Sequence, residues 1–346
     1  EDDIIYISGT EGSTSAYDIK TGKILFNIPN FRQIEGLGIW KGKVYYGTYT
    51  GSAFYRYDPN KPVNYLKGDP AGNPGLIYDE NDGQDRPFVV EPAGDLLLFG
   101  TIASYGKHDG AVFVYTEDEQ GNPNTKAYVG AIKNQGISGL AYKDGKIYAS
   151  STIVGGLGDD PIESQAKVAV LDAQTGEVLK EVVPDIPKVG TSSIVIGRMS
   201  FGPDGLLWAV SDKDGTIFAM DPDTLKVVKS KSLYPGASQG SKFVGHEILW
   251  GDDGTMYTTA GRKITAVNVE TMESKTLYKG PRDIMYLCRD SEGNLYYQNG
   301  ISLTRLPVNQ RQRLRGIIET AEKVKKGDAD EAQWKACLLY TSDAAD

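Results

Sequence analysis

The chain has 346 residues, 41 of them glycine and 21 tyrosine, and a formal net charge of −9 at pH 7. Its lysines and arginines form no cluster over the first 307 residues, so the basic face that nucleic acid or an anionic membrane requires is missing. No apolar run reaches the roughly 20 residues that span a bilayer. The sequence thus predicts a protein that neither binds nucleic acid nor crosses a membrane.

The chain opens with three short β-prone runs, at residues 4–8, 13–19 and 23–28. The segment from Asp18 to Gly22 joins the last two of these runs, and Asp and Gly are the residues that tight turns favour. A similar turn follows at residues 172–176. Because the sequence begins within a strand, we expect one further strand to lie upstream of it.

A longer unit then recurs along the chain. In residues 139–150 two β-prone runs flank an Asp-Gly turn, which is typical of a β-hairpin. Related units place their turn glycines at Gly42, Gly94, Gly145, Gly205, Gly254 and Gly293, with separations of 39 to 60 residues. That period suits four-stranded blades. We therefore predict an all-β fold, a seven-bladed β-propeller over residues 1–307. The expected blades are residues 1–30, 31–67, 84–133, 134–185, 194–232, 242–279 and 282–307.

Two long loops interrupt the repeat, at residues 104–110 and 153–165. Each joins the second and third strands of its blade, and the two blades are adjacent, so we expect the loops to emerge side by side and to form one groove. The candidate ligand-binding residues of this loop face are Tyr105, His108, Asp109, Asp159, Asp160 and Glu163. An aromatic ring among carboxylates suits a neutral or basic ligand. The alternative is that these residues are only solvated loop tips.

The three acidic residues of the second loop are oxygen ligands at short spacing, so a Ca²⁺ site is one interpretation. They do not follow the EF-hand pattern, and turn-forming, solvated carboxylates are the simpler interpretation. We predict no metal site.

The composition changes after Pro307. Leu314, Ile317, Ile318 and Ala321 recur at helical spacing, so a helical module is expected to start within residues 308–336. Residues 337–346 look like the translation of a sequencing adapter, and we expect them to lie outside the fold.

The Asp-Gly-Lys-Ile-Tyr turns and Tyr-Asp-x-x-Thr-Gly-Lys hairpins of residues 4–307 resemble bacterial extracytoplasmic β-propellers with YVTN, NHL, WD40-like or quinoprotein-like repeats. The segment beginning at Leu314, with Gln333-Trp-Lys after it, is similar to the opening of FIVAR helical modules. Those modules occur in secreted or wall-attached proteins that often act on glycans, so the resemblance implies an extracellular or cell-surface location. The vicinal cysteines and blade tryptophan motif of quinoprotein dehydrogenases are missing, and we expect no cofactor.

The sequence does not indicate a catalytic triad or a zinc site, because it has only two histidines and neither lies in such a motif. Counting back from the turn glycines places four ionisable residues at the start of inner strands, at the mouth of the central channel: Arg86, Arg198, His246 and Glu247. Such a cluster could bind an acidic sugar, or neutralise an enolate in β-elimination. The alternative is that these groups only hydrogen-bond neighbouring blades or channel water.

Two functions remain open from the sequence. The first is a secreted or surface recognition module, a monomeric part of a larger chain that binds a glycan or a protein through the loop face. The second is an enzyme, a polysaccharide lyase or a lactonase-like hydrolase, that uses the channel-mouth residues.

Overall fold

The computed structural model describes residues 3–9, 12–79, 83–237, 242–243, 246–299 and 302–308. In these ranges the strands form seven antiparallel sheets that follow one another along the chain, and the first and last have three strands where the others have four. The protein is a seven-bladed β-propeller, as the repeat predicts. The helix expected after residue 308 and the segment 337–346 fall outside the described residues.

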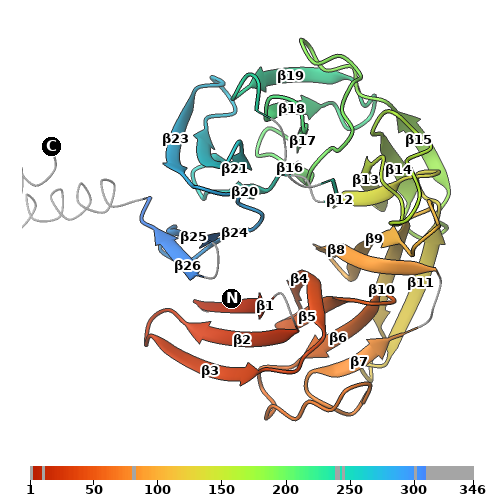
Figure 1. Cartoon of the computed structure of the whole chain (residues 1–346), viewed down its shortest axis with the longest axis vertical. Helices are drawn as coiled ribbons and strands as arrows, with labels where there is room; N and C mark the ends of the chain where they lie inside the picture. Colours follow the sequence, from red (N-terminus) through yellow and green to blue (C-terminus); the bar gives the residue numbers. More distant parts are fainter. Residues whose placement is uncertain are drawn as a thin grey trace, which may run out of the picture. The chain divides into compact units, whose positions relative to one another are not determined.

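Residues 1–286 form one compact unit, which contains the first six sheets. The strands of the first three are β1 (Ile4–Gly9), β2 (Ser13–Asp18), β3 (Lys23–Ile28), β4 (Gln33–Trp40), β5 (Lys43–Tyr49), β6 (Ala53–Tyr57), β7 (Gly75–Tyr78), β8 (Gln84–Ala93), β9 (Leu96–Ala103), β10 (Ala111–Glu117) and β11 (Pro123–Val129). Those of the next three are β12 (Gly136–Lys143), β13 (Lys146–Thr152), β14 (Val168–Asp172), β15 (Val178–Val182), β16 (Ser200–Phe201), β17 (Leu207–Val210), β18 (Thr216–Met220), β19 (Val227–Ser232), β20 (Ile248–Trp250), β21 (Met256–Ala260), β22 (Lys263–Val267) and β23 (Ser274–Lys279). The inner strands β4, β8, β12, β16 and β20 face a common centre (Figure 1).

The second unit, residues 287–346, contains the seventh sheet. Its strands are β24 (Leu287–Arg289), β25 (Leu295–Asn299) and β26 (Ser302–Leu306). Over the part of the chain that the structure describes, no helix is long and apolar enough to cross a membrane.

Turn chemistry shapes the blades as the sequence predicts. All six repeat glycines have positive φ, from 66° at Gly94 to 83° at Gly293, a conformation that costs glycine little. In the turn after β2, Oδ1 of Asp18 accepts hydrogen bonds from the backbone N–H groups of Lys20 and Thr21 at 2.9 and 3.1 Å. The second blade differs from expectation because its outer strand is β7, Gly75–Tyr78, which lies beyond residue 67, where this blade was expected to end.

The core of the first unit lies between neighbouring sheets. Phe54 of β6 stacks on Phe99 of β9 with ring centroids 3.9 Å apart, and Trp208 of β17 is fully buried beside Met256 of β21. Burying one such aromatic side chain contributes about 2–3 kcal/mol before entropy is counted. These contacts join each blade to the next and so fix the inner strands that carry the candidate channel residues.

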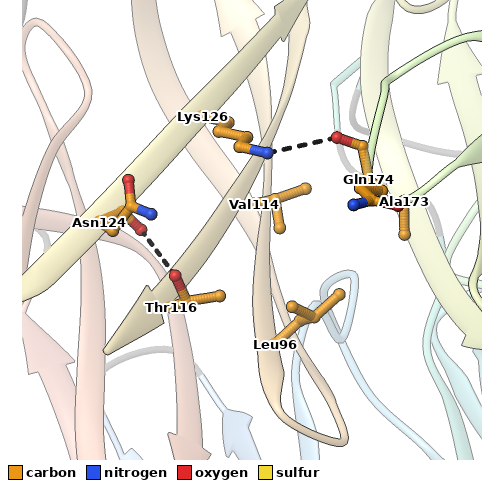
Figure 2. A pocket seen from close by; sticks show the side chains of 7 residues that line it. All are labelled: Leu96, Val114, Thr116, Asn124, Lys126, Ala173 and Gln174. Carbon is orange, nitrogen blue, oxygen red and sulfur yellow. Dashed lines mark hydrogen bonds between the residues drawn. The ribbon is translucent and has the colours of Figure 1, made fainter. Parts of the chain in front are cut away.

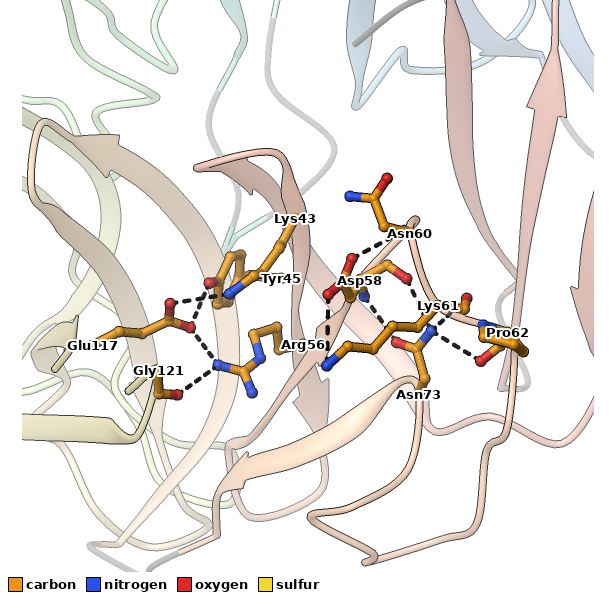
Figure 3. Close-up of polar contacts among 10 residues, drawn as sticks. All are labelled: Lys43, Tyr45, Arg56, Asp58, Asn60, Lys61, Pro62, Asn73, Glu117 and Gly121. Carbon is orange, nitrogen blue, oxygen red and sulfur yellow. Dashed lines mark hydrogen bonds and ion pairs between the residues drawn. The ribbon is translucent and has the colours of Figure 1, made fainter. Parts of the chain in front are cut away.

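A carboxylate also joins the second and third blades (Figure 3). Glu117 of β10 accepts hydrogen bonds from Tyr45 and Tyr115 at 2.9 Å, from Arg56 at 2.5 Å and from Lys43 at 3.2 Å. Burial alone would raise the pKa of Glu117, but these four donors hold it below its ordinary value. We call these five residues the Glu117 cluster. Both carboxylate oxygens are occupied, so the cluster is a structural contact between blades.

Candidate functional site

Charged side chains gather where the inner strands begin. Counting seven residues back from a turn glycine reaches Glu35, Arg198, Glu247 and Tyr286, and counting eight reaches Arg86. The register of β8 shifts on both sides of Arg86, which accounts for its offset of one residue. With Glu91 of β8, these residues form what we call the axial set: Glu35, Arg86, Glu91, Arg198, Glu247 and Tyr286.

The first ion pair of the axial set joins the second and third blades. A terminal nitrogen of Arg86 donates to Oε1 of Glu35 at 2.5 Å, and the guanidinium carbon lies 4.0 Å from the ring centroid of Tyr49. Burial raises the pKa of Glu35, against the opposing effect of Arg86. The guanidinium of Arg86 therefore contacts the protein through one terminal nitrogen and through its planar surface, while its buried Nε has no hydrogen-bond partner among the described residues.

The second ion pair joins the fifth and sixth blades. Nε of Arg198 lies 3.0 Å from Oε1 of Glu247, within ion-pair distance, but it donates no hydrogen bond to any residue that the structure describes. The backbone on both sides is fixed, since the N–H of Arg198 donates to the carbonyl of His246 and Thr258 donates to that of Glu247. Burial raises the pKa of Glu247, again opposed by its arginine.

Two further members connect these pairs. The hydroxyl of Tyr286 donates to the backbone carbonyl of Glu35 at 3.2 Å, and burial raises its pKa to about 12 although Arg198 lowers it. Burial raises the pKa of Glu91 to about 7, with Arg198 lowering and Glu247 raising it. Glu91 therefore changes charge near neutral pH beside Arg198.

His246 is separate from these contacts. Its side chain is buried, burial lowers its pKa to about 4, and among the described residues none hydrogen-bonds to its ring. The structure thus brings Arg198 and Glu247 together, but it pairs Arg86 with Glu35 instead of with the other candidates. The sequence interpretation missed Glu35, Glu91 and Tyr286. For Glu35 and Tyr286 the signal was present, because the same count from Gly42 and Gly293 reaches them.

The two long loops lie side by side, as expected. The N–H of Gly106 donates to the carbonyl of Leu157 at 2.9 Å, and that of Gly156 to the carbonyl of Lys107 at 2.5 Å. A Cβ atom at Gly156 would collide with the backbone of Ser104, so only glycine permits this approach. The loops therefore form one joined surface, and the expected groove between them is replaced by direct backbone contact.

The outer part of this surface carries the exposed candidates. Tyr105 is 58% exposed, and Ile162, which the sequence interpretation did not single out, is 59% exposed. Asp159 and Asp160 are also exposed, and Oδ2 of Asp159 lies 4.0 Å from Nε2 of His108. We call Tyr105, His108, Asp159, Asp160 and Ile162 the loop surface. It combines two apolar side chains with two carboxylates.

The other two acidic candidates, Asp109 and Glu163, are engaged in contacts with Lys133 and Asn134. Asp109 accepts from Nζ of Lys133 at 2.5 Å and from the N–H of Asn134 at 2.7 Å, and Glu163 accepts from the amide of Asn134 at 3.2 Å. Burial would raise the pKa of Asp109, but Lys133 and Asn134 hold it below its ordinary value. No three His, Cys, Asp or Glu residues within the described ranges are grouped as a metal site requires.

A hollow of about 210 Å³ lies between the third and fourth blades (Figure 2). It is lined by residues of neither the axial set nor the loop surface. Leu96, Val114 and Ala173 provide its apolar surface, and Lys126 reaches across to the carbonyl of Gln174 at 3.3 Å. It contains none of the candidate residues.

Comparisons with known proteins identify the fold. No family model and no curated protein matches the chain in sequence. The WD40 β-propeller domain of Doa1 covers 90% of the chain and 91% of its own length, with 12% identity and a TM-score of 0.60. A chain of the mitotic checkpoint complex covers 88% and 84%, with 11% identity and a TM-score of 0.63. Virginiamycin B lyase from Staphylococcus aureus covers 80% and 81%, with 14% identity and a TM-score of 0.56. At such identities the likeness extends to the propeller fold and not to function.

Proposed function

We propose that this propeller is a recognition module that binds another protein through the loop surface. The observation that carries the proposal is the exposure of Tyr105 and Ile162 on two loops that backbone hydrogen bonds fix to each other. Protein interfaces favour aromatic anchors on a rigid support, because less conformational entropy is lost on binding. Asp159 and Asp160 beside them, together with the net charge of −9, favour a neutral or basic partner.

One chain with a similar fold comes from the mitotic checkpoint complex, a protein assembly, which is consistent with protein recognition by a propeller. A glycan is the alternative ligand, because Tyr105 flanked by carboxylates also suits a sugar ring. The aliphatic Ile162 favours a polypeptide over a sugar. We further propose an extracellular or cell-surface location and a monomeric module within a larger chain, on the resemblance of residues 314–335 to FIVAR modules.

The proposal is tested by screening the chain against a displayed peptide library and a glycan array. The same screen is run with the double variant Tyr105→Ala/Ile162→Ser. We expect peptides rich in Lys, Arg and apolar residues to bind the wild type and to be lost with the variant. Enrichment of glycans alone would replace the protein partner by a sugar. Binding that the variant leaves unchanged would refute the loop surface as the site.

A second candidate function is a lyase or hydrolase that acts at the axial set. It is favoured by the charged pair of Arg198 and Glu247, by the neutral, buried His246 that precedes Glu247 in the chain, and by the likeness to a lyase from Staphylococcus aureus. A base and a cationic group are the parts that β-elimination needs. Product analysis on the glycan array distinguishes this function, because elimination leaves an unsaturated uronate, hydrolysis adds water and leaves a saturated product, and binding alone leaves the ligand intact.

A further inference from the structure

Arg198 is an arginine in the interior whose donors are left unused. Solvent reaches 19% of its side chain, and Nε is buried. A guanidinium has five N–H donors in a rigid plane, yet none of them donates a hydrogen bond to any residue that the structure describes. Buried donors are normally satisfied, because leaving one unpaired costs about 1–3 kcal/mol. The unused donors point to a binding partner that is not part of the chain.

The other arginine of the axial set makes a hydrogen bond that Arg198 lacks. Arg86 is equally exposed, at 19%, it also faces a glutamate, and its buried Nε likewise has no partner among the described residues. One terminal nitrogen of Arg86, however, donates a hydrogen bond to Glu35, and its guanidinium lies against the ring of Tyr49. The two arginines thus have the same burial and the same counter-charge. They differ in the hydrogen bonding of the terminal guanidinium nitrogens, so burial alone does not account for the unused terminal donors of Arg198.

We propose that Arg198 is the anchor of a binding site for a small organic carboxylate, which it holds through the donors that Glu247 does not use. Two parallel N–H groups match the two oxygens of a carboxylate, and such charge-assisted bidentate pairs are roughly twice as strong as neutral hydrogen bonds. The site is independent of the loop surface, so its failure or success does not decide the proposed protein recognition.

Charge balance determines how the acid would bind. Arg198 is surrounded by Glu247, Glu91 and Tyr286, while Glu35 and Arg86 neutralise each other. A ligand carboxylate beside an ionised Glu91 would be repelled. The acid therefore binds to the form of the protein in which Glu91 is protonated and neutral. Because burial raises the pKa of Glu91 to about 7, that proton is available at pH 6 and largely lost at pH 8. Affinity should therefore fall about tenfold between these two values.

Isothermal titration of the whole chain with acetate and with D-glucuronate tests the site, and D-glucose serves as the uncharged control. We expect both acids to bind in about the millimolar range at pH 6, about tenfold more weakly at pH 8, and glucose not to bind. The variant Arg198→Met/Glu247→Gln removes the pair without leaving a lone charge and should abolish binding. The matched variant Lys167→Met/Glu181→Gln removes an ion pair outside the axial set whose cation is equally exposed, at 19%, and should leave binding unchanged.

A third variant separates loss of the site from loss of the fold. Arg198→Lys keeps the charge but not the fork, and we expect about tenfold weaker binding with an unchanged circular dichroism spectrum. The proposal would be overturned if the wild type bound neither acid at an acid concentration of about ten times the expected dissociation constant. So would equal loss in the Arg198 and Lys167 double variants, or affinity that does not change with pH.

Discussion

The Glu117 cluster and the axial set are two places where charged side chains from different blades meet, and they use their charges differently. Glu117 accepts four hydrogen bonds from Lys43, Tyr45, Arg56 and Tyr115, and its pKa lies below the ordinary value. Glu91 lies near a single arginine, and its pKa is raised to about 7. A satisfied carboxylate holds blades together, whereas an unsatisfied one costs stability and is free to respond to a ligand or a proton.

The largest effect should follow from removing the satisfied charge. Glu117→Gln leaves Arg56 and Lys43 without their counter-ion in a half-buried contact, so we expect the free energy of unfolding to fall by about 3 kcal/mol. Denaturant unfolding at pH 7 measures this, and Glu119→Gln, at an exposed position two residues away, is the matched control. Since the pKa of Glu117 is lowered in the folded state, the difference should shrink as the pH falls through that pKa. Equal stability of the two variants at pH 7 would contradict the structural role.

Removing the carboxylate of Glu91, which has only one arginine near it, should have a smaller effect on the free energy of unfolding, and of opposite sign. The pKa of Glu91 rises from 4.5 to about 7 on folding, so its contribution to stability is complete below the lower value and is lost as the pH rises through the upper one. Glu91→Gln keeps an uncharged side chain at every pH. We expect its stability relative to wild type to increase by roughly 2 kcal/mol between pH 5 and pH 7.

Denaturant unfolding over that pH range is the measurement for Glu91, and Glu35 and Glu247 are present in both proteins, so their own titrations largely cancel. A difference that stays constant with pH would show that Glu91 does not titrate in this range, and the comparison with Glu117 would fail.

The smallest effect on stability should come from the loop surface. Tyr105 and Ile162 are more than half exposed, at 58% and 59%, so Tyr105→Ala/Ile162→Ser should change the free energy of unfolding by no more than about 0.5 kcal/mol. Thermal unfolding of the double variant checks this. A large loss of stability would mean that these side chains support the fold, and their exposure would no longer argue for binding.

Much of the fold was predictable from the sequence because it depends on local chemistry. The six turn glycines set the blade period, and each takes the positive φ that the hairpins require. The short β7 was missed because four β-prone residues lie among turn formers. Blade number follows from repetition, whereas the length of each outer strand depends on packing against the next blade.

The candidate sites were predictable in position but not in pairing. The count from the turn glycines reaches Arg198 and Glu247, which do meet. The pairing of Arg86 with Glu35 depends on a shift of register in β8 and on contact between blades, and neither can be predicted from the local sequence. Likewise, Gly156 removes the expected groove by allowing the two loops to touch, an approach that only the folded structure reveals.

The central claim, recognition through the loop surface, is tested most directly by the affinity of the selected peptide for three proteins: the wild type, Tyr105→Ala/Ile162→Ser and Arg198→Met/Glu247→Gln. Surface plasmon resonance measures all three under one condition. The account predicts that the loop variant loses at least about tenfold in affinity, the cost of removing two apolar anchors, while the axial variant binds like the wild type. Loss in the axial variant alone would contradict the account and move the binding site to the centre of the propeller.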